Sequence, residues 1–349
     1  MADIRKNKIL SLLNNPSQPK PKKMKSKLII VLLTIIGSAH VRSYANLSAD
    51  KNVFEINNSD KAFEKVEYKT ITVDSLNIFY REAGEISKPT ILLLHGFPSS
   101  SHMYRDLIND LADSYHVIAP DYPGFGQSSA PAVKQYQYTF DNLSTTIEHF
   151  IDKLNIKKTT LYLQDYGGPV GMRIATRRPE LIQAIIIQNA NAYVDGLGNL
   201  LKPLTAYIEN KNPETEKAAR FFLSPEATKW QYLTGAEDPS KIAPDSYIVD
   251  QYYLDRKGND EIQLALFSNY GTNIALYEKW HQYFVKFKPP MLVVWGKNDE
   301  FFVSAGALAY KKNNPTAEIH LLNGGHFLLE EHHLEVSKII KKFISKKLH

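Results

Sequence analysis

The stretch Thr159–Ile187, TTLYLQDYGGPVGMRIATRRPELIQAIII, decides the fold of this 349-residue chain. It opens with the apolar run Thr159–Leu163 and closes with the apolar run Ala184–Ile187, and both are typical of strands buried on two faces of a parallel sheet. Between these runs, Pro169–Arg178 has a helical pattern. A strand, a helix and a second strand in this order predict a right-handed βαβ unit.

The same alternation extends in both directions from this unit. The other predicted strands are Tyr68–Val73, Asn77–Glu82, Ile91–Leu94, His116–Ala119, Met291–Trp295 and Glu318–Leu322. The other predicted helices are Tyr104–Asp113, Phe140–Leu154, Ser304–Lys312 and Glu335–Lys346. The first two strands alternate polar and apolar residues and predict a hairpin. The whole pattern predicts an α/β fold with a mostly parallel, doubly wound sheet.

Residues 191–287 interrupt this rhythm with helical patterning, several prolines and no clear strand. A helical insertion inside a doubly wound sheet predicts a cap placed after the sixth strand. We therefore expect residues 63–190 and 288–349 to form the core, with residues 191–287 as the cap.

The first 45 residues have the composition of an export leader. Lys25 and Lys27 precede a short apolar run, and Ser43-Tyr44-Ala45 offers the small residues that a signal peptidase reads, which predicts cleavage near Ala45. The chain is then expected to be periplasmic or secreted, with a polar segment at residues 46–62 and no stable membrane span after cleavage. Met24 is an alternative start, and an uncleaved N-terminal membrane anchor is the alternative to cleavage.

Charge and motifs exclude several classes of function. Nine of the 42 Lys and Arg residues and one of the 37 Asp and Glu residues lie in residues 1–45, so the remainder holds 33 basic and 36 acidic residues. No basic, aromatic-interleaved stripe is left to indicate nucleic-acid binding. The run Glu330-Glu331-His332-His333 lacks the i, i+4 histidine spacing of a metalloprotease motif and is interpreted as a solvated surface. We predict neither a metal nor a cofactor.

Asp165 stands at the centre of the first loop that carries chemistry. In an open α/β sheet, ligands bind beyond the carboxyl ends of the strands. Leu163-Gln164-Asp165-Tyr166-Gly167-Gly168 follows a strand, precedes a helix and places glycines directly after the central residue, as in a nucleophile elbow. Taken alone, Asp165 could equally be a helix N-cap.

Three further loops at strand ends agree with a catalytic interpretation. His95-Gly96-Phe97-Pro98 follows a predicted strand and would supply one backbone N–H of an oxyanion hole, from Phe97, while Tyr166 would supply the other. His95 itself is interpreted as ordering the loop. His326, in Asn323-Gly324-Gly325-His326-Phe327, and Asp299, after Trp295, complete the chain order of nucleophile, acid and histidine.

At these residues the chain resembles the α/β-hydrolase family of haloalkane dehalogenases and epoxide hydrolases, from about Tyr68 to the C-terminus. The resemblance implies an α/β-hydrolase fold and a reaction in which Asp165 forms a covalent alkyl ester. His326 would then activate the water that attacks the aspartyl carbonyl, and Asp299 would orient the imidazole. The partners would be water and a small, apolar substrate, by analogy with haloalkane dehalogenases.

The sequence departs from this family where the leaving group would bind. Haloalkane dehalogenases usually place Trp directly after the nucleophile, but this chain has Tyr166 at that position. The candidate leaving-group donors are Tyr166, Trp230 and Tyr232, with Trp280 as a further tryptophan in the cap. Epoxide hydrolases use two cap tyrosines, and this cap has nine: Tyr193, Tyr207, Tyr232, Tyr247, Tyr252, Tyr253, Tyr270, Tyr277 and Tyr283. Gln164, directly before the nucleophile, is closer to the dehalogenase pattern, whereas the cap tyrosines could serve an epoxide hydrolase. Because these two signals conflict, both substrate classes remain open. A non-catalytic ligand-binding module with the same fold is the remaining alternative.

Overall fold

The computed structural model describes residues 66–348, so the predicted leader and the polar segment at residues 46–62 lie outside the described part. Eight strands form one sheet in the order β1-β2-β4-β3-β5-β6-β7-β8. Their bounds are β1 Glu67–Val73, β2 Leu76–Ala83, β3 Thr90–Leu94, β4 His116–Pro120, β5 Thr159–Gln164, β6 Ile182–Gln188, β7 Met291–Gly296 and β8 Glu318–Leu322. Strands β1, β2 and β4 pair antiparallel and the other neighbours pair parallel, which confirms the predicted α/β-hydrolase fold class.

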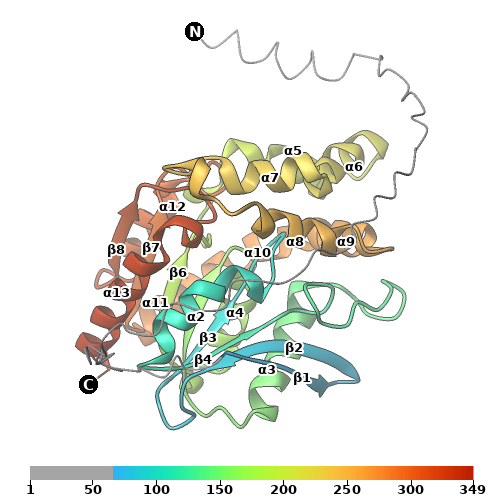
Figure 1. Ribbon diagram of the computed structural model, residues 1–349. Coiled ribbons are helices and arrows are strands. Elements are labelled where there is room, and N and C mark those ends of the chain that lie inside the picture. Colours follow the sequence, from blue (N-terminus) through green and yellow to red (C-terminus); the bar gives the residue numbers. More distant parts are fainter. Residues whose placement is uncertain (1–65, 349) are drawn as a thin grey trace, which may run out of the picture. The chain divides into compact units, whose positions relative to one another are not determined.

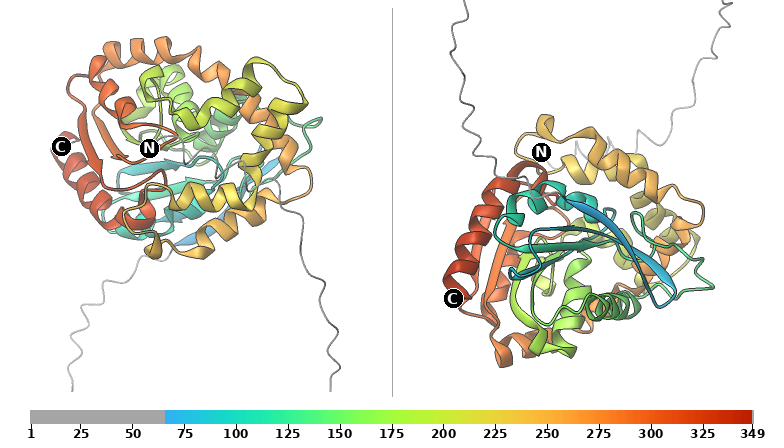
Figure 2. Two further views of the ribbon diagram at one scale, coloured as in Figure 1. Left: turned by 90° about the horizontal axis from the view of Figure 1, so that it is seen from above. Right: turned by 60° about the horizontal axis from the view of Figure 1, so that its bottom comes forward.

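Helices cover both faces of this sheet, as Figure 2 shows from two further sides. The core helices and 3₁₀ turns are η1 Ser101–Tyr104, α2 Arg105–Ala112, α3 Phe140–Lys153, α4 Gly167–Arg177, η2 Pro179–Leu181, α12 Ser304–Ala309, η7 Tyr310–Lys312 and α13 Leu329–Lys347. Successive strand residues point to opposite faces. Leu92 and Leu94 pack in the apolar cluster that includes α3 and α4, whereas Ile91 and Leu93 pack with α2 and α13. Burial on both faces explains the continuous apolar runs in the sequence.

The helical insertion lies between β6 and β7, and in Figure 1 its helices α5, α6 and α7 lie above the sheet. Its elements are η3 Val194–Gly196, η4 Asn199–Leu201, α5 Lys202–Glu209, α6 Pro213–Arg220, η5 Phe221–Leu223, α7 Pro225–Leu233, η6 Pro239–Lys241, α8 Pro244–Leu254, α9 Asn259–Asn269, α10 Gly271–Ile274 and α11 Tyr277–Phe287. Across residues 66–348, no helix is long and apolar enough to cross a membrane.

The start of α13 differs from the sequence-based expectation. The helix begins six residues earlier than predicted and is kinked at His332. The interpretation of Glu330–His333 as a solvated surface was wrong, because the Glu330 side chain is 3% exposed and accepts hydrogen bonds from Arg105 and from Ser246 of α8. Glu331 accepts two backbone N–H groups from the cap segment before η6. The run joins the cap to the core, which a local pattern of charges does not reveal.

Replacing Gly167 by Ala is expected to destabilise the protein by about 1–3 kcal/mol, the usual cost of overpacking. An added Cβ would lie 1.9 Å from the backbone oxygen of Leu94, so strand β3 would have to shift. Gly168→Ala is the matched control in the same helix. Its Cβ would lie 3.0 Å from a side-chain atom of Ala190, and Ala gains about 1 kcal/mol of helix propensity over Gly. Urea unfolding measures the free energy of unfolding of both variants relative to the wild type. Equal stability of Gly167→Ala and the wild type would contradict the prediction.

Candidate active site

Asp165 lies in the turn between β5 and α4 with a φ of +46°, in the left-handed region that non-glycine residues rarely adopt. This backbone turn brings the side chain out at the carboxyl end of the sheet. The turn is also tightly packed, because a Cβ on Gly96 would lie 2.2 Å from the Cβ of Asp165. Gly96 and Gly167 are therefore required by close approach.

The carboxylate of Asp165 is buried, and the backbone N–H of Phe97 donates a 2.7 Å hydrogen bond to its Oδ1. Burial raises the pKa of Asp165 to about 6. The positive field of His326 and the N–H groups of Phe97 and Tyr166 lower the pKa, but they do not offset the loss of water. The two predicted oxyanion donors thus lie beside the carboxylate.

His326 lies between the two acidic residues. Its Nδ1 lies 2.7 Å from Oδ2 of Asp299, and its Nε2 lies 4.0 Å from Oδ2 of Asp165. Burial works against the charged imidazole, yet the carboxylates of Asp299 and Asp165 together raise the pKa of His326 above its ordinary value. The imidazole is therefore oriented by Asp299 and directs its other nitrogen toward Asp165.

Asp299 is itself fixed by neighbouring groups. Its Oδ1 accepts the backbone N–H groups of Phe301 and Phe302 at 2.8 and 3.1 Å. Its Oδ2 also accepts a 2.8 Å hydrogen bond from Nδ2 of Asn189, which follows β6. These contacts satisfy the carboxylate and hold it toward the imidazole.

Gln164 is a site residue whose contact the sequence did not indicate. Its amide nitrogen lies 3.1 Å from Nε2 of His326, the nitrogen that faces Asp165. His95, in contrast, makes the structural contacts expected of it: Tyr122 donates its backbone N–H to Nε2 at 3.2 Å. Burial lowers the pKa of His95 to about 4, so it is neutral near pH 7.

A cavity of about 60 Å³ opens over Asp165 and His326. Most of its wall is apolar and comes from both the core and the cap: Phe97, Leu197, Leu201, Leu204, Ile208, Phe222, Phe267, Ile274, Phe301 and Phe302. Apart from Asp165 and His326, the polar residues of the wall are Tyr166, Thr205, Gln231 and Tyr270. Such a cavity suits a small apolar molecule with a single reactive group.

The structure brings Tyr166 into this wall but not the other predicted donors. Trp230 packs its ring on Phe301, Tyr232 donates its hydroxyl to Asp250, and neither lines the cavity. Successive residues of a helix point roughly 100° apart, so it is Gln231, between them on α7, that faces the cavity. Trp280 is fully buried in α11 and does not line the cavity.

Tyr270 is the one residue among the nine cap tyrosines that lines the cavity. Its ring centroid lies 6.2 Å from that of Tyr166, and its hydroxyl contacts Tyr277, which accepts a 3.3 Å hydrogen bond from Asn191. Burial raises the pKa of Tyr270 well above its ordinary value, so the phenol is a neutral donor near pH 7. Nothing in the local sequence separates Tyr270 from the other eight tyrosines.

Within residues 66–348, no group of three or more His, Cys, Asp and Glu side chains is arranged to hold a metal ion. The polar groups around the cavity are a carboxylate, an imidazole, an amide, an aliphatic hydroxyl and two phenols. This set is suited to nucleophilic and general acid–base chemistry at a small organic molecule.

Comparisons with known proteins agree with this architecture. Residues 89–333 match the α/β hydrolase fold family. A hydrolase of Saccharomyces cerevisiae, itself uncharacterized, is 39% identical over 282 residues, which cover 80% of this chain and 95% of the yeast protein. Human epoxide hydrolase 4 is 26% identical over 296 residues, which cover 79% of this chain and 78% of the human protein.

A third relative, a haloalkane dehalogenase of Mycolicibacterium paratuberculosis, is 35% identical over a shorter span of 115 residues, or 33% of this chain and 38% of that protein. The family match covers more than half of the chain, and the yeast relative is aligned over nearly its whole length. The chain belongs to the α/β-hydrolase fold family and is related, within it, to epoxide hydrolases and haloalkane dehalogenases.

Proposed function

We propose that this protein is a hydrolase in which Asp165 is the nucleophile and forms a covalent alkyl ester with a small apolar substrate. The observation that carries the proposal is the placement of a buried carboxylate, held by the Phe97 N–H, 4.0 Å from the Nε2 of an imidazole that Asp299 orients. A water molecule roughly 2.8 Å from each group would fit between that carboxylate oxygen and Nε2.

In the first half-reaction, Oδ2 of Asp165 attacks an sp³ carbon and the bond from that carbon to the leaving group breaks. Because Oδ1 is held by the N–H of Phe97, Oδ2 is the freer oxygen. Among the polar groups of the wall, which also include the Thr205 hydroxyl and the Gln231 amide, the phenols of Tyr166 and Tyr270 are those to which we assign hydrogen bonds to the departing atom. The apolar wall excludes water and leaves the carboxylate weakly solvated, which favours its attack.

In the second half-reaction, His326 takes a proton from water, and the resulting hydroxide attacks the carbonyl carbon of the aspartyl ester. Negative charge develops on Oδ1, where the N–H of Phe97 stabilises it, and the N–H of Tyr166 lies beside the same carboxyl group. The ester then breaks, the departing alkoxide takes the proton from His326 to become the product alcohol, and the proton left on the regenerated Asp165 carboxyl group is released to water. The Asp299 carboxylate stabilises the charged imidazole between these steps.

Haloalkanes are the substrates that we propose first, since displacement of a halide needs only hydrogen-bond donors around the leaving atom. Epoxides, opened to diols, are the second candidate, and the position of Tyr270 in the cavity wall favours them. An epoxide oxygen leaves as an alkoxide and needs a proton, which a phenol supplies. The relationship to human epoxide hydrolase 4 over most of the chain supports the same candidate.

Replacing His326 by Gln is expected to trap the ester. Gln cannot act as the base, so the first half-reaction would proceed and the second would stop. Incubation with 1-bromobutane or an epoxide and intact-mass spectrometry should show one added butyl or hydroxyalkyl group, respectively, which peptide mapping assigns to Asp165. The control variant Asp165→Ala should gain no mass. Unmodified Asp165 in His326→Gln, together with unchanged turnover, would contradict the proposal.

The pH dependence of kcat/KM should have an acid limb near pH 6. Asp165 must be ionised to attack, and its raised pKa means that protonation removes the nucleophile as the pH falls through about 6. Below that point, kcat/KM should fall about tenfold per pH unit. Steady-state rates between pH 4 and pH 8 measure the limb. A limb near pH 4 would show that the reactive carboxyl group is not buried as described.

The substrate class is tested with parallel panels of haloalkanes and epoxides, measuring halide release and diol formation. Tyr270→Phe should lower kcat/KM for epoxides about 100-fold or more, because it removes a general acid. The same change should cost bromoalkanes less than about tenfold, the value of one lost hydrogen bond to a stable anion. Equal losses for both classes would argue against Tyr270 as the proton donor. Tyr283→Phe, outside the cavity wall, is the matched control.

A further inference from the structure

Arg173 is a buried cation outside the cavity, on the helix that starts at the Asp165 turn. Its side chain is 2% exposed, and its Nε contacts Oδ1 of Asp141 at 2.8 Å, although Asp141 itself is 68% exposed. Burying a guanidinium costs several kcal/mol unless its donors are satisfied, and apolar residues of similar volume often serve stability as well. A buried guanidinium at this position therefore indicates that the groups hydrogen-bonded to it must be held in a defined arrangement.

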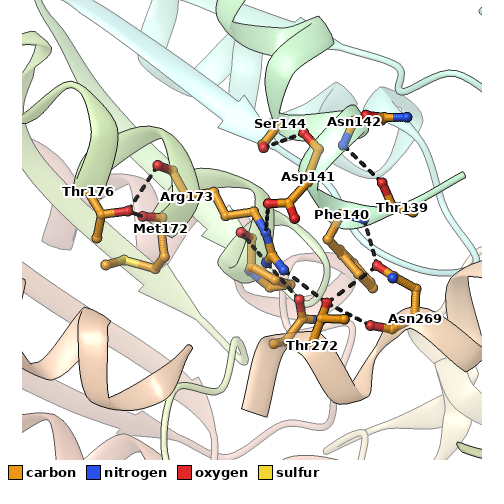
Figure 3. Close-up of polar contacts among 12 residues, drawn as sticks. Thr139, Phe140, Asp141, Asn142, Ser144, Met172, Arg173, Thr176, Asn269 and Thr272 are labelled. Carbon is orange, nitrogen blue, oxygen red and sulfur yellow. Dashed lines mark hydrogen bonds and ion pairs between the residues drawn. The ribbon is translucent and has the colours of Figure 1, made fainter. Parts of the chain in front are cut away.

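The other donors of Arg173 reach the cap, as Figure 3 shows. Its Nη1 donates to Oδ1 of Asn273 at 2.7 Å and to the backbone oxygen of Pro169 at 3.2 Å, and its Nη2 donates to Oγ1 of Thr272 at 3.0 Å. Pro169 belongs to α4 itself, whereas Thr272 and Asn273 belong to α10. One side chain of the helix at the nucleophile turn is thus bonded directly to the cap.

Two more hydrogen bonds close the network. Oδ1 of Asn269, the last residue of α9, accepts the backbone N–H of Phe140 at 2.9 Å. Thr272 donates its hydroxyl to the backbone oxygen of Asn269 at 2.8 Å. The chain segment Asn269–Asn273 is therefore held at three side chains by groups of α3 and α4.

Tyr270 lies inside this segment. The ring of Phe140 connects the network to the cavity wall: its centroid lies 4.9 Å from that of Tyr166 and 5.8 Å from that of Tyr270. The guanidinium of Arg173 lies 5.7 Å from the centroid of the same ring. A shift of Asn269–Asn273 would move Tyr270 relative to Tyr166 and Asp165.

We infer that Arg173 is a positioning residue that fixes Tyr270 against the nucleophile by binding Thr272 and Asn273. This inference rests on the proposed function, since it assigns Tyr270 a place in the reaction at Asp165. We call the contacts of Arg173 with Thr272 and Asn273 the clamp. The clamp connects helix α4, which begins at the nucleophile turn, directly to the part of the cap that lines the cavity. Small displacements of a group in a reactive site cost up to about 100-fold in rate.

Asn273 offers the sharpest test, because its amide uses only one of its two ends. Oδ1 accepts from Arg173, while Nδ2 has no hydrogen-bond partner among residues 66–348. Asn273→Asp keeps the acceptor and makes the contact to Arg173 charge-assisted. Asn273→Leu keeps the branched shape of the side chain and removes the acceptor.

Asn273→Leu is expected to lower kcat/KM about tenfold or more, whereas Asn273→Asp should stay within about threefold of the wild type. Tyr270→Phe is then made in both backgrounds. It should cost much less in Asn273→Leu than in Asn273→Asp, since a displaced phenol has little left to lose. A merely structural role for the clamp would lower the melting temperature of Asn273→Leu and leave the cost of Tyr270→Phe equal in both backgrounds, which would overturn the inference.

A second measurement separates this inference from the proposed function. Hydrogen exchange of peptides that cover residues 259–276 should be faster in Asn273→Leu than in Asn273→Asp and the wild type. Binding of 1-butanol, followed by ligand-observed NMR, should weaken in Asn273→Leu alone. If no haloalkane or epoxide is turned over, these two results still decide whether the clamp holds the cavity wall, and unchanged exchange with unchanged binding would overturn it.

Discussion

The structure depends on keeping one carboxylate, that of Asp165, out of water at a turn with positive φ. The backbone there is strained, and the charge is desolvated, so both must be stabilised by the surroundings. The N–H of Phe97 provides the direct hydrogen bond, and the imidazole of His326 provides the compensating field. Gly96 and Gly167 allow the backbones of β3 and α4 to approach closely enough for this arrangement.

Besides apolar packing, buried or half-buried polar contacts attach the cap to the core at two of its edges. On one side, Glu330 of α13 binds Arg105 of α2 and Ser246 of α8. On another, Arg173 of α4 binds Thr272 and Asn273 of α10. A hydrogen bond requires a defined distance and angle between donor and acceptor, whereas apolar side chains can shift along one another and stay in contact. Two such attachments therefore fix the position of the cap helices over the cavity more narrowly than apolar packing alone would.

Much of this organisation could be predicted from the sequence, because the strands and their loops have local signals. Apolar runs locate the buried strands, and topology then brings Asp165, Asp299 and His326 to one edge of the sheet. The cap is different. The buried face of helix α8 consists mostly of polar residues, and α9 buries residues around much of its circumference, so apolar periodicity does not tell which side faces the cavity. The sequence therefore favours Trp230 and Tyr232 by residue type alone, whereas the packing of the cap places Gln231 and Tyr270 in the cavity wall.

The coupling between Asp165 and His326 explains how one site could serve both halves of the proposed reaction. The first half requires a charged Asp165, and that charge raises the pKa of His326. Alkylation of Oδ2 removes the charge, so the proton affinity of the imidazole falls at the moment when it must become a neutral base. The N–H of Phe97, which first holds the carboxylate, then stabilises the oxyanion on the same oxygen. Formation of the ester would thus itself prepare the site for hydrolysis, without any movement of the backbone.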